Sequence, residues 1–305
     1  MNESMTELRA VLFMLDGDAG EPQTRTQQEL GRACAHLAAC GIDAEWEVCG
    51  KTAETGENAE DEVCAGQVPQ KDALILTDSE WILREMTDAG FAAAGYLHDD
   101  VQNVPGASYL IAEADEISPE DYEKIYDRLT GRPWTILVTE RVIVRETTAE
   151  DADRLYECYD AQALRFLTPL PDKETQLRNM ASYREKVYGF YGFGEWSLID
   201  KESGAFIGLM GFEPFAQGEE AVHFGFLLHP DWRGKGIACE CGRALLAYGE
   251  RCLGFSVIRA EASPENKDSV GLLQKLGFAL VGTGEDNGKI EEIYEYRTAA
   301  KMPRY

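Results

Sequence analysis

Basic residues are scarce in this sequence of 305 residues. Lys and Arg together number 29 against 55 Asp and Glu, which gives a formal net charge of −26. A chain of this charge repels phosphate backbones and anionic lipid headgroups, so we expect neither nucleic acid nor a membrane surface as a main partner. The same charge attracts cations, and amines are among them.

Long apolar runs are also missing. No stretch approaches the roughly 20 apolar residues that a membrane-spanning helix needs. The acidic start, Met1-Asn2-Glu3, lacks the basic segment that opens a secretory signal peptide. Both absences predict a protein of the cytoplasm.

The sequence lacks the residue patterns of a metal centre. It has four histidines and eight cysteines but no C-x-x-C pair, so zinc-finger spacing and a redox dithiol are excluded, and we expect no metal site. Cysteines scattered among apolar residues are typical of small buried side chains in a reducing compartment. The cysteines are Cys34, Cys40, Cys49, Cys64, Cys158, Cys239, Cys241 and Cys252.

What the sequence does contain is enough for two folded domains. Hydrophobic residues make up 44% and the length fits two domains of ordinary size. Residues 1–134 hold 28 acidic and 9 basic side chains, whereas residues 135–305 hold 27 and 20. This change of charge coincides with a Gly/Pro break near Gly131–Thr135. We therefore expect one domain over residues 1–132 and a second over 138–305.

The first domain alternates short apolar strands with helices. A capping box is predicted at Thr26–Glu29, at the start of a helix that ends at Gly41. The polar stretch Lys51–Gln70 is expected to be a mobile insertion. Alternation of this kind predicts a small parallel sheet with helices on both faces, an α/β domain of Rossmann-like type. The expected strands are Ala10–Leu15, Ala44–Cys49, Ala73–Thr77 and Phe91–Leu97, and the later helices are Glu80–Asp88 and Pro119–Thr130.

The second domain has a different pattern. A capping box at Thr147–Glu150 predicts a helix through Tyr159, and Gly254 and Gly277 end two later helices. The strands outnumber the helices and follow one another through short turns. This indicates an α+β domain whose central sheet is largely antiparallel. The expected strands are Arg141–Arg145, Trp196–Asp200, Ala205–Phe212, Ala221–His229, Phe255–Ala262, Phe278–Val281 and Glu291–Tyr296, and the other helices are Lys173–Val187, Gly236–Leu253 and Lys267–Leu276.

The most informative motif is the glycine-rich turn that joins a strand to a helix at Leu228–Ala238. Glycine lets the backbone approach a ligand closely, and the helix N-terminus adds positive charge, so such a turn can bind a pyrophosphate. It is not a Walker A loop, because Gly236 follows Lys235 and His229 stands where the first glycine belongs. A plain turn before a helix is the alternative interpretation.

A second motif follows about 30 residues later. Asn266-x-x-Ser269 opens a helix that ends in Leu276-Gly277-Phe278, and locally Asn266 is a good N-cap. Together with Arg233-x-x-Gly236-x-Ala238, this motif closely resembles the GNAT superfamily of N-acetyltransferases. The resemblance covers about 141–297 and is greatest to the branch that acetylates the N-termini of ribosomal proteins.

The resemblance implies acetyl-CoA as cosubstrate and a GNAT fold for residues 138–305. Strand residues would pair with the pantetheine arm, and backbone amides of the turn would hold the pyrophosphate. A neutral amine would attack the thioester directly in a ternary complex, after a base has removed its proton. The coenzyme-binding residues implied are Phe226, Leu227, Leu228, Arg233, Gly234, Lys235, Gly236, Ile237, Ala238 and Asn266.

The acid and the base are implied less directly. Many family members carry a tyrosine where this sequence has Leu273, so Ser269 is the nearest candidate for protonating the thiolate; helix capping is its alternative role. His223 occupies the place of a strand glutamate that often serves as base, and Glu240 matches a commonly acidic position. An ordinary sheet histidine and a favourable charge in the first helical turn are the corresponding alternatives.

Aromatic residues and glycines are dense between Tyr188 and Trp196. One interpretation is a wall of the acceptor pocket, with Tyr191 and Glu195 contacting an amine. The alternative is a turn leading into a core strand.

The first domain carries Asp16-x-Asp18 after its first strand and Thr77-Asp78-Ser79 after a later one. These motifs resemble those of haloacid dehalogenase-like hydrolases, which use an aspartate nucleophile and Mg²⁺. Gly20 and Ile82 depart from the family pattern. We therefore expect a degenerate, non-catalytic domain.

These observations predict an acetyl-CoA-dependent N-acetyltransferase that acts on a primary amine. The acceptor is either an amine-bearing small molecule or a protein N-terminus, and a homodimer is a possible assembly. Two other functions are left open. One is a catalytically silent acyl-CoA sensor, which the missing tyrosine at Leu273 favours, and the other is Mg²⁺-dependent phosphatase activity in the first domain.

Overall fold

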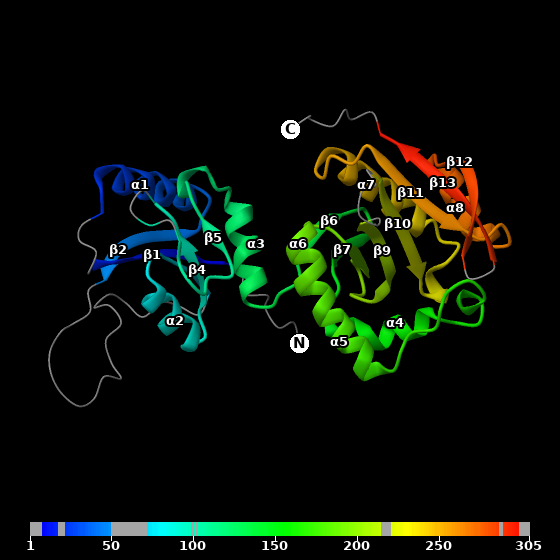
Figure 1. The fold of residues 1–305 in the computed structure, drawn as a ribbon, viewed down its shortest axis with the longest axis horizontal. Helices are drawn as coiled ribbons and strands as arrows, with labels where there is room; N and C mark the ends of the chain where they lie inside the picture. Colours follow the sequence, from blue (N-terminus) through cyan, green and yellow to red (C-terminus); the bar gives the residue numbers. More distant parts are fainter. Residues whose placement is uncertain are drawn as a thin grey trace. The chain divides into compact units, whose positions relative to one another are not determined.

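A computed structural model describes residues 8–17, 22–49, 72–98, 101, 103–214, 221–286 and 289–298. The chain divides into two compact units, Met1–Arg132 and Pro133–Tyr305 (Figure 1). The expected insertion Lys51–Gln70 lies outside the described residues, as do Asp18 and Gly20. Among the described helices, none has the length and apolar character needed to cross a bilayer.

The first unit is built on a five-stranded sheet of order β2-β1-β3-β4-β5 in which all neighbouring strands are parallel. The expected parallel sheet is therefore present, and β5 is a short edge strand that the sequence pattern does not predict. The strands are β1 (Ala10–Asp16), β2 (Asp43–Cys49), β3 (Ala73–Thr77), β4 (Ala92–Tyr96) and β5 (Leu110–Ile111).

Helices cover both faces of this sheet. Leu30 of α1 (Thr24–Ala39) and Tyr122 of α3 (Pro119–Leu129) are buried in one apolar cluster. Helix α2 (Glu80–Asp88) packs into a second cluster, and Figure 1 shows it on the side of the strands opposite α1. Parallel strands buried on both faces need such cover, because their apolar side chains point to both sides. The narrower Rossmann-like or hydrolase-like identity of this unit stays a prediction.

The two predicted capping boxes are placed incorrectly. Helix α1 begins at Thr24 with Gln23 as N-cap, so Thr26 is a buried residue within the helix and caps nothing. In the second unit the capping box exists one residue later than expected, between Thr148 and Asp151. The error has a physical reason: adjacent Thr and acidic residues offer overlapping boxes, and burial of one side of the helix selects the frame.

The second unit is built on an eight-stranded sheet of order β12-β13-β11-β10-β9-β8-β7-β6. All its strand pairs are antiparallel except β10 with β11. The strands are β6 (Thr135–Val138), β7 (Val142–Glu146), β8 (Glu195–Asp200), β9 (Phe206–Pro214), β10 (Ala221–Leu228), β11 (Val257–Ala262), β12 (Ala279–Asp286) and β13 (Lys289–Arg297).

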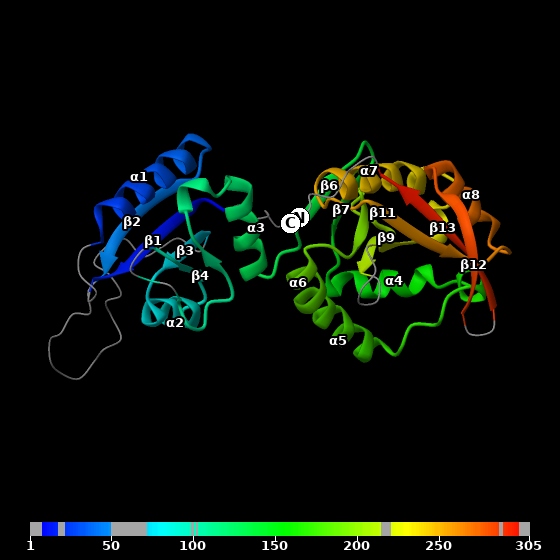
Figure 2. The ribbon, with the colours of Figure 1, turned by 45° about the horizontal axis from the view of Figure 1, so that its top comes forward.

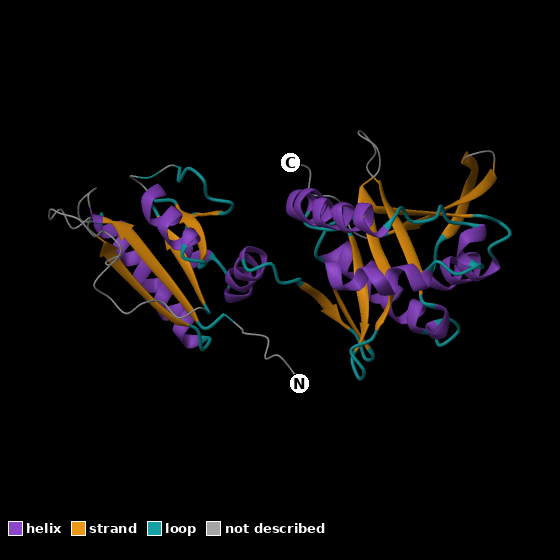
Figure 3. Ribbon diagram, turned by 90° about the horizontal axis from the view of Figure 1, so that it is seen from below, coloured by secondary structure: helices purple, strands orange, loops and turns teal. Residues whose placement is uncertain are grey.

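Two layers of helices enclose this sheet. Figure 2 shows α7 (Ile237–Arg251) and α8 (Lys267–Leu276) above the strands and α4 (Ala152–Cys158) and α5 (Lys173–Tyr183) below them. Figure 3 shows the same strands, in orange, gathered between the helices. A π-helical turn, Arg184–Tyr188, and the short α6 (Gly189–Tyr191) continue α5. The predicted helix Lys173–Val187 is thus a composite of α-helical and π-helical turns.

The core of the second unit lies mainly between the sheet and α7 and α8. Trp196 is completely buried there, and its ring makes edge contacts with Phe212 and Tyr248 at centroid distances of 6.0 Å. A smaller cluster on the other face joins Leu155 of α4 to Phe206. Because strand side chains alternate between faces, β10 sends Phe224 into the main core and Leu227 towards the smaller cluster.

The expectation that the cysteines are free, buried thiols holds for only some of them. Cys158 and Cys241 are free and buried, and burial raises the pKa of both thiols to about 12. Cys49, at the end of β2, is disulfide-bonded, which corrects the expectation of thiols throughout.

Candidate active site

The parallel strands β10 and β11 separate partway along their length. They pair only at Ala221, Val222 and His223 of β10. From Phe224 to Leu228, β10 continues to pair with β9 on its other side. The edge of β10 that faced β11 therefore becomes available over its second half. Backbone donors and acceptors at such an edge need another partner.

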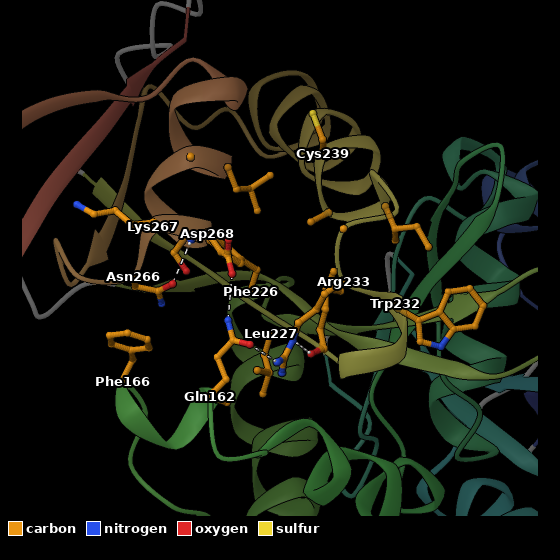
Figure 4. Close-up of a pocket in the computed structure, with 18 of the residues that line it drawn as sticks. Gln162, Phe166, Phe226, Leu227, Trp232, Arg233, Cys239, Asn266, Lys267 and Asp268 are labelled. Atoms are coloured by element: carbon orange, nitrogen blue, oxygen red, sulfur yellow. Dashed lines mark hydrogen bonds between the residues drawn. The ribbon is translucent and has the colours of Figure 1, made fainter.

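A pocket of about 700 Å³ opens at this edge, within the size range of cofactor sites. Figure 4 shows Phe226 and Leu227 at its floor, with Asn266 and Asp268 on one side and Arg233 and Trp232 on the other. The structure thus brings both sequence motifs to one cavity. The predicted residues that line it are Phe226, Leu227, Leu228, Arg233, Gly234, Gly236, Ile237, Ala238, Asn266 and Ser269.

The glycine turn needs glycine for its backbone conformation. Gly234 and Gly236 have φ values of 73° and 81°, in the left-handed region that other residues rarely adopt. Gly236 is the N-cap of α7, and as a glycine it has no side chain that could cap the helix. The first N–H groups of α7 therefore point out of the helix without a side-chain cap, at its positive end. This arrangement can bind a phosphate group.

The side chain of Arg233 has a local structural role. Its guanidinium donates to both carboxylate oxygens of Asp160, at 2.8 and 3.2 Å, and to the Leu228 carbonyl at 3.0 Å. The hydrogen bonds from Arg233 hold the pKa of Asp160 below its usual range. Arg233 thus ties the end of β10 to the segment after α4. Lys235 does not line the pocket; its ammonium lies 5.0 Å from the Trp232 ring centroid.

Glu240 is engaged with the turn between β6 and β7. Its carboxylate accepts hydrogen bonds from Thr139 Oγ1 at 2.6 Å and from the Arg141 amide at 3.0 Å and Nε at 2.7 Å. Burial by itself raises the pKa of Glu240, but these hydrogen bonds and the Arg141 charge outweigh it and lower the pKa. Arg141 also donates to the Lys235 carbonyl at 3.0 Å. This pattern favours a positioning role for Glu240, which holds the glycine turn through Arg141.

The second motif has its predicted capping geometry. Asn266 Oδ1 accepts the backbone N–H of Ser269 at 3.3 Å, and Gly277 ends α8 with φ 93°. The Ser269 residue lines the pocket, whereas Leu273 is fully buried in the core. The position that carries a tyrosine in many family members is therefore filled here by an apolar core side chain.

Several pocket residues carry no signal in the sequence. Gln162 and Phe166 belong to the segment after α4 and reach the pocket from the other side of the sheet edge (Figure 4). Gln162 Nε2 donates to Asp268 Oδ2 at 3.0 Å, which links this segment to α8. Lys267 and Lys275 add positive charge to the lining. Only the fold brings these residues together, and no local motif marks them.

Glu195 lies on the face of the sheet that α4 and α5 cover. It pairs with Gly211 of β9, and Gly211 pairs with Gly225 of β10, so the three residues form one row across the sheet. A Cβ built on Gly225 would lie 2.7 Å from Glu195 Oε1. The carboxylate therefore rests directly over the Gly225 backbone, one residue before the pocket residues Phe226 and Leu227.

The surroundings of Glu195 favour its neutral form. Burial raises its pKa to about 7, and the negative charge of Glu213 adds to the effect. Two tyrosines fix its backbone: Tyr183 Oη accepts the Glu195 N–H at 2.8 Å, and Tyr188 Oη donates to the Glu195 carbonyl. A strand start held in this way keeps the carboxylate over Gly225.

His223 and Tyr191 lie outside the pocket lining. His223 is half-buried and pairs with Glu213 of β9 and Arg259 of β11, on the same sheet face as Gly225. Tyr191 is 45% exposed on α6, where its ring contacts Phe190 and Phe193. The structure therefore places His223 on the same sheet face as Glu195 and leaves Tyr191 at the surface.

A smaller acidic hollow of about 350 Å³ occurs in the first unit, where β1 and β3 end. Asp78 Oδ1 accepts the Asp16 N–H at 2.7 Å, and Asp16 Oδ2 accepts the Ser79 hydroxyl at 2.9 Å. His98 Nε2 lies 3.1 Å from Asp78 Oδ2. Within the described part of the chain, no group of three or more His, Cys, Asp or Glu is arranged to hold a metal ion.

Comparison with known proteins identifies the class of this fold and site. Residues 141–279 match the model of the acetyltransferase (GNAT) domain. The uncharacterised N-acetyltransferase p20 of Bacillus licheniformis is 30% identical over 167 residues, which cover 52% of this chain and 93% of that protein. The chain belongs to the GNAT acetyltransferase family. It is an N-acetyltransferase that uses acetyl-CoA, and the expected GNAT fold with a mostly antiparallel sheet is confirmed.

A further relative and a solved structure are also similar to this chain. The ribosomal protein uS5-alanine N-acetyltransferase of Escherichia coli is 30% identical over 166 residues, covering 50% of this chain and 83% of that protein. A GNAT-family acetyltransferase structure from Bacillus anthracis covers 53% of this chain and 97% of its own, at 20% identity and a TM-score of 0.46. The relatives named here match about half of the chain.

Proposed function

We propose that the second unit transfers the acetyl group of acetyl-CoA to a primary amine by direct attack in a ternary complex. The observation that carries this proposal is the pocket at the open edge of β10, which ends at the glycine turn before α7. One cavity thus combines an unpaired strand edge, suited to an amide-bearing arm, with an anion-binding helix start.

Different residues of this pocket would bind different parts of the coenzyme. The amides that follow Gly234 and Gly236 would hold the pyrophosphate, because they point out of α7 at its positive end. The backbone of Phe226–Leu228 would hydrogen-bond the pantetheine arm as an added strand does. The chain carries a net charge of −26, so the local cations Lys267 and Lys275 are needed to attract a polyanionic coenzyme.

Acid catalysis in this site would depend on Ser269. Its position on the pocket wall leaves the hydroxyl as the candidate donor to the departing thiolate, directly or through water. Thiols have pKa values near 8.5, so the thiolate is a fair leaving group and needs only modest assistance. Asn266 would contact the coenzyme in addition to capping α8.

For the acceptor we propose a protein N-terminus in preference to a small-molecule amine. The support is the relative from Escherichia coli, whose name specifies the alanine of a ribosomal protein.

The test is acetyl-CoA turnover by the full chain, followed as release of free thiol. The panel contains peptides with N-terminal Ala, the same peptides with a blocked N-terminus, spermidine and free lysine, and mass spectrometry locates the added 42 Da acetyl group. We expect acetylation of the free peptide N-terminus. Turnover confined to spermidine or lysine would overturn the choice of acceptor, and none with any amine would overturn the function.

The coenzyme site has a separate test in thermal unfolding. Acetyl-CoA at 100 times its Kd should stabilise the second unit by about 2.7 kcal/mol. Gly236→Asp should abolish this shift, because it places a carboxylate against the pyrophosphate. Gly204→Asp is the matched control, since Gly204 also has positive φ, at 70°, but lies in a turn outside the pocket. An equal shift in both variants would place the coenzyme elsewhere.

The buried Leu273 favours a second candidate function, a catalytically silent acyl-CoA sensor. A sensor would show the thermal shift with acetyl-CoA and the loss of that shift in Gly236→Asp. It would release no thiol with any member of the amine panel. The two measurements together therefore separate enzyme from sensor.

A further inference from the structure

We propose that Glu195 is the catalytic proton acceptor for the incoming amine, which it meets on the α4–α5 face of the sheet directly over Gly225. This role rests on the proposed acetyl transfer and adds to it a residue and a direction of approach. The amine would reach the thioester from the face opposite α7 and α8.

The position of the carboxylate is built into the sheet. Glu195, Gly211 and Gly225 occupy one row across β8, β9 and β10. A Cβ on Gly211 would lie 2.7 Å from Glu195 Cα, and one on Gly225 would lie 2.7 Å from Glu195 Oε1. Any side chain at either position would displace Glu195. The two glycines therefore leave room for the Glu195 side chain to lie across the sheet as far as β10.

This row of residues ends at β10, the strand that we propose binds the coenzyme. Gly225 lies two residues beyond the last β10–β11 pair at His223 and immediately before Phe226, which lines the coenzyme pocket. Glu195 Oε1 is thus held against the part of β10 whose edge is open to the thioester arm. A proton acceptor must lie within hydrogen-bond reach of the attacking nitrogen, and this carboxylate lies at the strand that would present the acyl group.

The hydrogen bonding of Glu195 differs from that of the other candidate acids. Within the described part of the chain, no donor is bonded to its carboxylate, whereas Glu240 accepts hydrogen bonds from Thr139 and Arg141. Burial raises the pKa of Glu195 to about 7, so both protonation states are populated near neutral pH. The titratable groups that face it are Glu213 of β9, His223 of β10, Tyr159 after α4, Tyr183 of α5 and Tyr188.

The proton balance is complete with the groups named. The acceptor ammonium gives one proton to ionised Glu195, and the resulting neutral amine attacks the thioester carbon. A C–N bond forms and the C–S bond breaks, and the second proton leaves the nitrogen for the thiolate through Ser269 or water. The products are the N-acetyl amine and the free thiol of coenzyme A, and Glu195 returns its proton to solvent.

The acidity of this group also selects the acceptor. An α-amine with pKa near 8 loses its proton to a base of pKa about 7 at a cost of about one pKa unit. A lysine or polyamine nitrogen with a pKa near 10.4 costs about 3.4 units, so its reactive neutral form is about 250 times less populated than that of the α-amine. The second carboxylate, Glu213, would attract the charged ammonium before transfer. The chemistry therefore favours a peptide α-amine.

Glu195→Gln is the direct test, with Glu202→Gln in an exposed turn as control. At pH 7 we expect kcat/KM for an N-terminal Ala peptide to fall at least a hundredfold in Glu195→Gln and to be unchanged in Glu202→Gln. The thermal shift with acetyl-CoA should remain in both. In wild type, kcat/KM should fall tenfold per pH unit below a break at about pH 7. In Glu195→Gln this break should move to about pH 8, the pKa of the acceptor amine itself.

Gly225→Ala is a second variant. It keeps the Glu195 carboxylate but displaces it from its position over β10, because the new Cβ would lie 2.7 Å from Glu195 Oε1. We expect at least a tenfold loss of kcat with the acetyl-CoA shift retained. If wild type acetylates the peptide while Glu195→Gln keeps more than half of its activity and the break near pH 7, the role of Glu195 is refuted and the proposed function stands. If wild type acetylates no amine, the proposed function itself fails, and this role with it.

Discussion

Two acidic sites, one in each unit, differ in how their carboxylates are bonded. In the first unit, Asp78 accepts a hydrogen bond from the Asp16 backbone N–H, and Asp16 accepts one from the Ser79 hydroxyl. His98 Nε2 also lies within hydrogen-bond distance of Asp78. In the second unit, the Glu195 carboxylate has no bonded donor within the described residues, and burial raises its pKa to about 7. Hydrogen bonds to the first pair of carboxylates hold local structure, whereas burial without a bonded donor raises the pKa of the second.

The same contrast exists within the second unit. The carboxylate of Asp151 accepts hydrogen bonds from both Nη atoms of Arg145 and from Ser197 Oγ, each at 2.8 Å. Burial alone raises the pKa of Asp151, but these partners outweigh it and lower the pKa. Asp151, like Glu240, is thus a carboxylate whose bonded donors outweigh the effect of burial on its pKa. Burial by itself does not separate catalytic from structural carboxylates; the donors around them do.

The largest expected effect on stability comes from breaking a bonded carboxylate. Asp151→Asn removes the charge partner of the largely buried Arg145, and we expect a loss of about 3 kcal/mol in the free energy of unfolding. Asp153→Asn is the control, because its ion pair with Lys173 is exposed and contributes less than about 1 kcal/mol. Denaturant titration of the full chain measures both. Equal losses would remove the distinction between bonded and exposed acids.

The next effect is the contribution of Glu195 to the pH dependence of stability. Folding raises the pKa of Glu195 from about 4.3 in the unfolded chain to about 7. The folded state is therefore favoured while Glu195 is protonated, and this contribution to the free energy of unfolding is lost as the pH rises from about 4.3 through about 7. Glu195→Gln should remove this loss. Between pH 5 and pH 8 the variant should therefore gain on the order of 2 kcal/mol relative to wild type. The acetyl-CoA-sensitive melting transition reports it, and parallel pH profiles would contradict it.

A smaller effect is expected at the wall of the coenzyme pocket. Ser269→Ala should reduce kcat by about tenfold to a hundredfold and leave coenzyme affinity nearly intact, since the capping bond to Asn266 uses the Ser269 backbone N–H. Asn266→Ala should weaken coenzyme binding and remove the cap, at about 1 kcal/mol of stability. Steady-state kinetics and the acetyl-CoA shift separate the two variants. If Ser269→Ala keeps full kcat, the serine is only part of the cap.

The smallest effect is expected at the first acidic site. The full chain should release no phosphate from phosphoesters with Mg²⁺, because Asp16 and Asp78 are engaged in hydrogen bonds and Ile82 replaces a late acid. Asp16→Asn should therefore show the same background as wild type. Mg²⁺-dependent turnover that disappears in Asp16→Asn would show that a bonded carboxylate can still act as nucleophile.

The sequence by itself determined the elements whose signals are local. The glycine turn at Gly234 and Gly236 and the cap at Asn266 follow from backbone conformation and side-chain hydrogen bonding, which act over a few residues. The motifs were therefore sufficient for the family and for most of the coenzyme pocket. The capping frames at Thr26 and Thr147 were wrong, because several adjacent residues offer equivalent local bonds and burial of the helix chose between them.

Only the tertiary structure decided which acid is bonded and which is not. Glu240 and Glu195 look alike in sequence, yet contacts more than 90 residues away supply Glu240 with Thr139 and Arg141. Glu195 instead meets Gly211 and Gly225, which carry no donor side chain and leave it over the open strand. Long-range contacts therefore decide which donors reach each carboxylate. Packing of α7 brings Glu240 to the turn between β6 and β7, and strand register places Gly211 and Gly225 beside Glu195.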